Sequence, residues 1–268
     1  MKLTITTALG AALLTGLPAL ADKTAILDNY ADIALAKYTD SLTTAQKLID
    51  AVTAHTEAPS AEYLAAATAL MVSDQEWMVS QTQDGGDTRT QLTADETAGL
   101  SAILTDMGSL SCGEQAGERM RLGVLLNDPE EEHDCFSDNT HNSHFYDALG
   151  IRNVYLGSYT CIDGTIVSGE NLSWLVARAD ADVEAELRAK LDATMREMSE
   201  MKTTAEAGFA YDMMLERGNA AGKALIMGAV DAFVAQTRSI ERAVAVLGVE
   251  GITFEGSDSL DDPNAVFQ

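Results

Sequence analysis

The sequence predicts an all-α protein, an antiparallel helix bundle that carries one small β-hairpin. Two observations lead to this fold class. Apolar residues recur at steps of three and four over long stretches, first over 26–52 and again over 225–247, as in helices that bury one face. The exception is 153–168, where β-branched and aromatic residues flank Asp163-Gly164, the signal of a two-residue hairpin turn.

Turn and capping residues divide the rest of the chain into further helices. Pro59-Ser60 ends the first helix, and Gly85-Gly86 lies in a polar loop. Thr93-x-x-Glu96 has the form of a capping box, and Ser137 or Asp138 can cap a short helix that ends at Gly150. The helices expected after the first one span about 61–82, 93–107, 114–126, 138–150, 171–179, 182–201, 203–217 and 220–247, before an extended tail over 249–268.

The first 21 residues have the form of a signal peptide. Lys2 precedes an apolar run over 3–17, and Ala19-Leu20-Ala21 supplies the small residues that favour cleavage after Ala21. The run is shorter than the roughly 20 residues that a membrane-spanning helix needs. We therefore expect a periplasmic protein that does not span a membrane, with a mature chain over 22–268.

The chain is strongly acidic, with 17 Lys and Arg against 42 Asp and Glu and a formal net charge of −25. Contacts to phosphate need clustered basic side chains, so this balance argues against nucleic acids and anionic membranes as partners. It is compatible with binding of cations, although many exported proteins carry acidic surfaces for solubility alone.

Three cysteines, Cys112, Cys135 and Cys161, leave the redox state open. Export would allow one disulfide and leave one thiol over. The sequence does not select the pair.

One segment concentrates the residue types that bind metals. Residues 128–144 hold three of the four histidines, six carboxylates and a cysteine. His141 and His144 share one face if they lie on a helix, and Glu132 and His133 come shortly before them. Imidazole and carboxylate together suit zinc, iron or copper. The alternative is a polar helix start in which Ser137 or Asp138 caps the helix and His141 bonds to the backbone.

Long stretches of the chain resemble imelysin-like proteins, which include iron-regulated periplasmic proteins once described as insulin-cleaving peptidases. The resemblance implies a partial N-terminal helical bundle over 22–90 and a C-terminal imelysin-like helical domain over 91–268. The stretches that carry it are 24–70, GEQAGERM over 113–120, EEEHDCFSDNTH over 130–141, GIRNVYLG over 150–157, AQTRSIE over 235–241 and FEGSDSLDDP over 254–263.

The chain departs from the family pattern in its N-terminal half. The family signature Gly-x-His-x-x-Glu does not occur in this sequence, and Thr53 stands where the glycine before His55 would be. Relative to the family, a block on the order of 100 residues is missing here. The resemblance therefore implies no proteolysis and carries over only the half-site around Glu132, His133 and the residues that follow.

Three functions stay open. The leading hypothesis is a non-proteolytic periplasmic protein that binds iron or another transition metal, or assists iron-uptake proteins. The second is a zinc metallopeptidase, which needs three ligands, an open position and a general base. The third is a truncated helical scaffold that only binds a protein partner, with its exposed helix faces covered by repacking or by a second copy in a homodimer. The candidate metal ligands are Glu132, His133, Asp138, His141 and His144.

Overall fold

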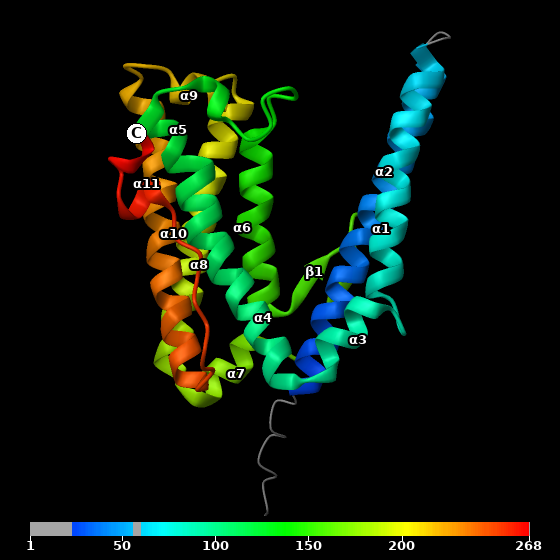
Figure 1. The fold of residues 1–268 in the computed structure, drawn as a ribbon, viewed down its shortest axis with the longest axis vertical. Helices are drawn as coiled ribbons and strands as arrows, with labels where there is room; N and C mark the ends of the chain where they lie inside the picture. Colours follow the sequence, from blue (N-terminus) through cyan, green and yellow to red (C-terminus); the bar gives the residue numbers. More distant parts are fainter. Residues whose placement is uncertain (1–22, 56–59, 268) are drawn as a thin grey trace, which may run out of the picture.

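Helices make up almost all of the computed structural model of the protein, which describes residues 23–55 and 60–267 (Figure 1). The predicted all-α bundle is confirmed. Within the described residues, the β structure is one antiparallel pair, β1 (Ser158–Thr160) and β2 (Ile166–Ser168), with Tyr159 opposite Val167. The predicted signal peptide lies outside the described residues. No helix in the described part of the chain has the length and apolar character needed to cross a membrane.

The first two helices form a hairpin that stands beside the rest of the molecule (Figure 1). Helix α1 (Lys23–His55) packs along α2 (Ser60–Thr82), and the short α3 (Asp87–Ala94) leads from α2 back to the base of α1. Figure 1 shows the hairpin meeting the main body at its lower end and diverging from it above.

The main body is a bundle of four rods. The first rod is continuous from Glu96 to Leu126 and changes helix type along its length, and it packs against α6 and α10. Short elements connect the rods at the two ends of the bundle. The elements of the body are α4 (Glu96–Ser109), the π-helix η1 (Leu110–Arg121), α5 (Leu122–Leu126), the 3-10 turn η2 (Pro129–Glu131), α6 (Thr140–Leu156), α7 (Leu172–Ala179), α8 (Ala181–Glu206), α9 (Tyr211–Leu215), α10 (Ala220–Leu247), α11 (Asp258–Asp261) and the 3-10 turn η3 (Ala265–Phe267).

Two predicted helix starts are wrong. Asp95, not Thr93, caps α4: its side chain accepts hydrogen bonds from the backbone N–H groups of Thr97 and Ala98, both at 2.9 Å. The Thr93 hydroxyl instead bonds inside α3. Helix α6 starts at Thr140, after Asn139, so neither Ser137 nor Asp138 caps it.

Other predicted helix ends are shifted. Gly150 lies inside α6, which continues to Gly157, a residue in the left-handed region (φ 60°) that closes the helix. The break expected near 108–113 is absent, because α4 passes directly into η1. Helix α8 runs on to Glu206, which leaves only five residues for α9. The tail, expected to be extended, contains α11.

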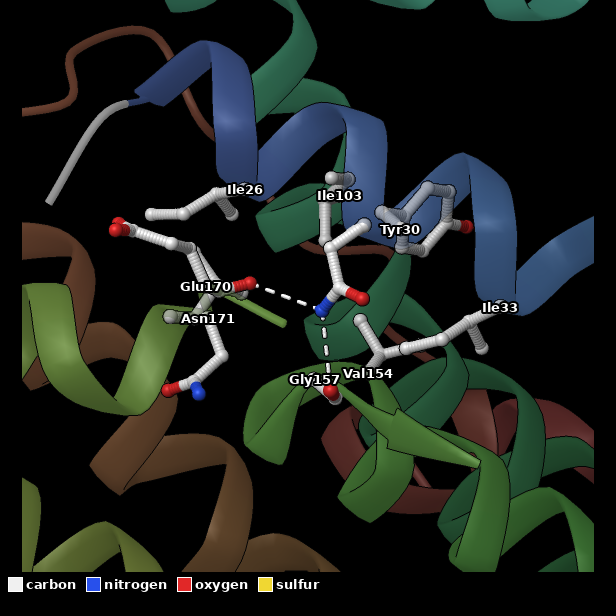
Figure 2. Close-up of a pocket in the computed structure, with 10 residues that line it drawn as sticks. Ile26, Tyr30, Ile33, Ile103, Val154, Gly157, Glu170 and Asn171 are labelled. Atoms are coloured by element: carbon white, nitrogen blue, oxygen red, sulfur yellow. Dashed lines mark hydrogen bonds between the residues drawn. The ribbon is translucent and has the colours of Figure 1, made fainter. Parts of the chain in front are cut away.

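Asn29 anchors the hairpin to the body. Its side chain is 7% exposed, and its amide donates hydrogen bonds to the carbonyl of Gly157 at 3.0 Å and that of Glu170 at 2.9 Å. Figure 2 shows both bonds at the centre of a small pocket lined by Ile26 and Tyr30, among others. The pocket is therefore a joint between α1 and the β-hairpin region.

Replacing Asn29 with Ala removes both hydrogen bonds from a buried joint, although the carbonyl of Gly157 keeps the backbone N–H of Gly169 as a donor at 3.2 Å. We expect the free energy of unfolding to fall by about 1–3 kcal/mol. Urea denaturation followed by circular dichroism measures this loss. Thr44→Ala, at an exposed position on the same helix, is the control, and an equal loss in the two variants would contradict the anchoring role.

Candidate functional site

The predicted metal-binding segment lies at the end of the bundle that also holds α9, at the top of Figure 1. After η2 the chain makes an exposed turn over 133–139 and then enters α6. Thr140, which is fully buried, ties the turn to the helix. Its hydroxyl donates to Oε2 of Glu132 at 2.9 Å and accepts from the backbone N–H of Asp134 at 3.0 Å. These bonds place Glu132 and His133 over the first turns of α6.

His144 is the most unusual residue of this region. It is fully buried, and neither of its ring nitrogens makes a hydrogen bond of good geometry; the backbone carbonyl of Arg119 is a weak acceptor only. The ring of Tyr211 meets it edge-on, with the ring centroids 5.2 Å apart. Burial lowers the pKa of His144 to about 3; His133 and Arg119 add to this shift, and the Arg119 carbonyl opposes it. The imidazole is therefore neutral at pH 7, the form that binds metals.

His133 lies next to His144 but is exposed to solvent. The two ring centroids are 6.3 Å apart, and the ring planes are inclined by 31°. With metal–nitrogen bonds of roughly 2.0–2.1 Å, two imidazoles on one tetrahedral ion have centroids about 5 Å apart. The rings of His133 and His144 are therefore about 1 Å farther apart than one ion requires, and His133, at the start of the exposed turn, would have to move toward His144.

His141 lies one helical turn before His144 and is 9% exposed. Its Nε2 is 3.2 Å from the side-chain nitrogen of Asn142, whereas its Nδ1 is buried without a partner. Asn142 is held in turn by Lys202, whose ammonium donates to the side-chain oxygen Oδ1 of Asn142 at 2.6 Å. The Nδ1 atom is therefore the part of His141 that a ligand could use.

Glu132 supplies a carboxylate at the same end of the bundle. Its pKa is raised mainly by burial, and the nearby Asp212, Asp138 and Asp134 raise it further, against the lowering effect of the Thr140 hydrogen bond. These carboxylates make the local potential negative, which favours a bound cation.

The structure places four of the five predicted ligands at one end of the bundle. We call Glu132, His133, His141 and His144, with Tyr211, the histidine cluster. Asp138 lies on the exposed turn, in the left-handed region at φ 49°, and is near enough to Glu132 to raise the pKa of that carboxyl. No three His, Cys, Asp or Glu side chains of the described residues converge closely enough, as they stand, to hold a metal ion. All three cysteines are free, with Cys135 exposed.

A second polar group next to the cluster was not predicted. Gln115 and Arg119 on η1 both bond to Oδ2 of Asp147 on α6, the arginine at 2.8 Å. Gln115 is fully buried, and its Oε1 has no partner. Burial raises the pKa of Asp147, and the Arg119 charge opposes that rise. The stretch 113–120 in the family resemblance was one signal for this group, and no sequence pattern pointed to Tyr211.

His144 should make the protein sensitive to acid. Its pKa is about 3 in the folded chain and 6.5 without burial. Between these values the unfolded chain binds the extra proton, so stability falls as the pH drops from about 6.5 toward 3, by at most about 1.4 kcal/mol per pH unit. His144→Leu should lose less stability than the wild type between pH 7 and pH 4.5 in urea titrations. His55→Leu, at the histidine outside 128–144, should keep the wild-type dependence; a curve for His144→Leu that is parallel to that of the wild type would contradict the assignment.

Comparison with known proteins assigns the chain to a family. The family model described as Imelysin, peptidase family M75, matches residues 61–240, which are 180 of the 268 residues. No curated protein matches the chain. The matched region begins in α2, includes the whole histidine cluster and ends in α10. The chain belongs to the imelysin family.

Proposed function

We propose that this protein binds a transition-metal ion at the histidine cluster and acts as a non-proteolytic metal-binding or iron-uptake accessory protein of the periplasm. The observation that carries the proposal is the neutral, fully buried ring of His144 with two nitrogens that make no hydrogen bond of good geometry. A buried polar group without a partner costs about 1–3 kcal/mol. Such groups are rare in native proteins, and a bound ligand is one of the ways to satisfy them.

The residues of the cluster fit a transition metal. His144 would be the buried ligand and His133 the solvent-facing one, and Glu132 and the Nδ1 atom of His141 are the nearest further donors. Two or three imidazoles with one carboxylate suit iron, zinc or copper. Asp138 would join them only through a change in the exposed turn that carries it. The metal would supply positive charge to a region where several carboxylates lie close together.

The sequence supports binding rather than peptide hydrolysis. The family signature Gly-x-His-x-x-Glu is missing from the chain. A zinc hydrolase also needs an open coordination position and a general base next to the bound water. Export through the signal sequence over 1–21 would place the cluster in the periplasm, where the net charge of −25 would draw cations toward the surface.

Titration calorimetry on the metal-free mature chain, residues 22–268, tests the proposal with Fe(II), Fe(III), Cu(II) and Zn(II). We expect one ion per chain. His144→Ala and His133→Ala should each weaken binding by roughly 100-fold or more, because loss of a direct ligand should cost at least as much as the 10–100-fold seen for outer-shell partners. Because the metal would bind the folded chain, we expect the unfolding temperature to rise with the metal concentration.

His55→Ala is the matched control, since His55 is the histidine outside 128–144. It should bind the metal as the wild type does. Stoichiometric binding that survives the His133→Ala/His144→Ala double variant would place the site elsewhere. Binding of no ion above the weak level of an acidic surface would refute the proposal, and metal-dependent hydrolysis of peptides would contradict its non-proteolytic part.

A further inference from the structure

The π-helix η1 lies between the histidine cluster and the C-terminal tail. Its 12 residues, Leu110–Arg121, form an unusually long π-helical segment. Most π-helical segments are single turns within α-helices, and many lie at functional sites. A segment this long needs contacts from outside to hold its winding, and the tail supplies them on one side.

Two glycines of η1 bring its backbone into contact with the tail. A Cβ atom placed on Gly117 would lie 2.2 Å from Cβ of Ser257, and one placed on Gly113 would lie 2.8 Å from the carbonyl oxygen of Glu255. Any larger residue at Gly117 would therefore push the tail away. The glycines are required by this close approach.

Hydrogen bonds fix the tail on the same turn of η1. Ser259 donates its hydroxyl to the carbonyl of Gly117 at 3.0 Å, and Arg121 donates to the carbonyl of Ser259 at 2.6 Å. Ser257 donates to Glu118 at 2.6 Å. Both serines are buried, at 5% and 1% exposed. The Gly117 carbonyl also accepts the backbone N–H of Leu122, the bond that defines the π-helical register at this point.

The inner side of the same turn faces the cluster. Arg119, two residues after Gly117, is paired with Asp147 at 2.8 Å, and its carbonyl accepts from the Tyr211 hydroxyl at 3.5 Å. Its charge also helps to lower the pKa of His144. A change from π-helical to α-helical winding would increase the rotation between successive residues and so turn Arg119 relative to α6. Arg119 would then leave Asp147 and the cluster.

We propose that the tail segment Glu255–Ser259, which we call the tail clamp, holds η1 in its π-helical register and thereby positions Arg119 and Gln115 beside Asp147 and His144. Arg119 is a positioning residue in this arrangement. The effect of the clamp on metal binding rests on the proposed function, but its effect on the surroundings of the His144 ring does not.

The test uses the full mature chain with ¹⁵N-labelled histidine and follows the ring signals of the four histidines by NMR, assigned with single His→Gln variants. Gly117→Ala should displace the clamp and shift or broaden the His144 signals. Gly117→Ala/Ser257→Gly removes the side chain that Ala at 117 would strike, and should return the signals toward their wild-type positions. Gly150→Ala is the control, because a Cβ atom on this helical glycine meets nothing within 4 Å; it should leave the signals unchanged.

Amide hydrogen exchange over 250–262 reports in the same samples whether the clamp has left η1. Displacement of the clamp with unchanged His144 signals would overturn the inference. If Gly117→Ala does not fold, Ser259→Ala takes its place; it removes the hydroxyl that bonds to Gly117 and Ser257 and adds no bulk, and a smaller shift of the His144 signals is expected. A chain that shows this pattern but binds no metal would support the clamp and contradict the proposed function.

Discussion

The close contact between the tail and the first rod of the body is the constraint on which the rest of the bundle depends. Three glycines line the contact: Cβ atoms placed on Gly108, Gly113 and Gly117 would meet Phe254, Glu255 and Ser257, respectively. Because the tail takes this face, the rod is enclosed by α6, α10 and the tail. The rod is therefore buried on several sides, and its face toward α6 presents the charged Arg119 to the half-buried carboxylate of Asp147.

The charge distribution of the protein makes the histidine end different from the rest. The chain carries a large negative charge overall, yet the fully buried imidazole of this region, His144, is neutral. Around it, burial raises the pKa values of Glu132 and Asp147. Desolvation therefore acts against charge on both the histidine and the carboxylates. A cation that enters such a site meets uncharged nitrogen donors inside an acidic surround, which favours a metal ion over an organic cation that needs aromatic faces.

Local sequence patterns predicted most of the helices because amphipathic periodicity and glycine stops are local properties. Gly248 ends α10 in the left-handed region, as expected. The errors fall where tertiary structure decides. We expected a break near Gly108 and Gly113, but these two glycines and Gly117 serve the packing of a tail about 140 residues away in sequence. A π-helix has no recognised sequence pattern.

The candidate site was predicted by composition and only partly by position. His141 and His144 share a face of α6 as their spacing indicated, but the sequence could not show that His144 would be fully enclosed. Tyr211 approaches the ring from α9, and Arg119 reaches Asp147 from η1, through contacts between elements that are distant in sequence. Asp138 was included because of its neighbours in the chain, and the turn places it on the surface instead.

The N-terminal hairpin is attached to the body near one end only, so a small rotation at the attachment causes a larger displacement at the other end. Its described side-chain hydrogen bonds to the β-hairpin region come from Asn29 and from Asp40, which accepts from Tyr159 at 2.8 Å, and both lie before residue 41 of α1. Beyond them α1 continues for about 15 residues, or roughly 22 Å, away from the body (Figure 1). A tilt of about 10° at the joint would move the far end of α1 by about 4 Å. Small changes around Asn29 are therefore amplified along a surface that carries the exposed Leu48 and Trp77.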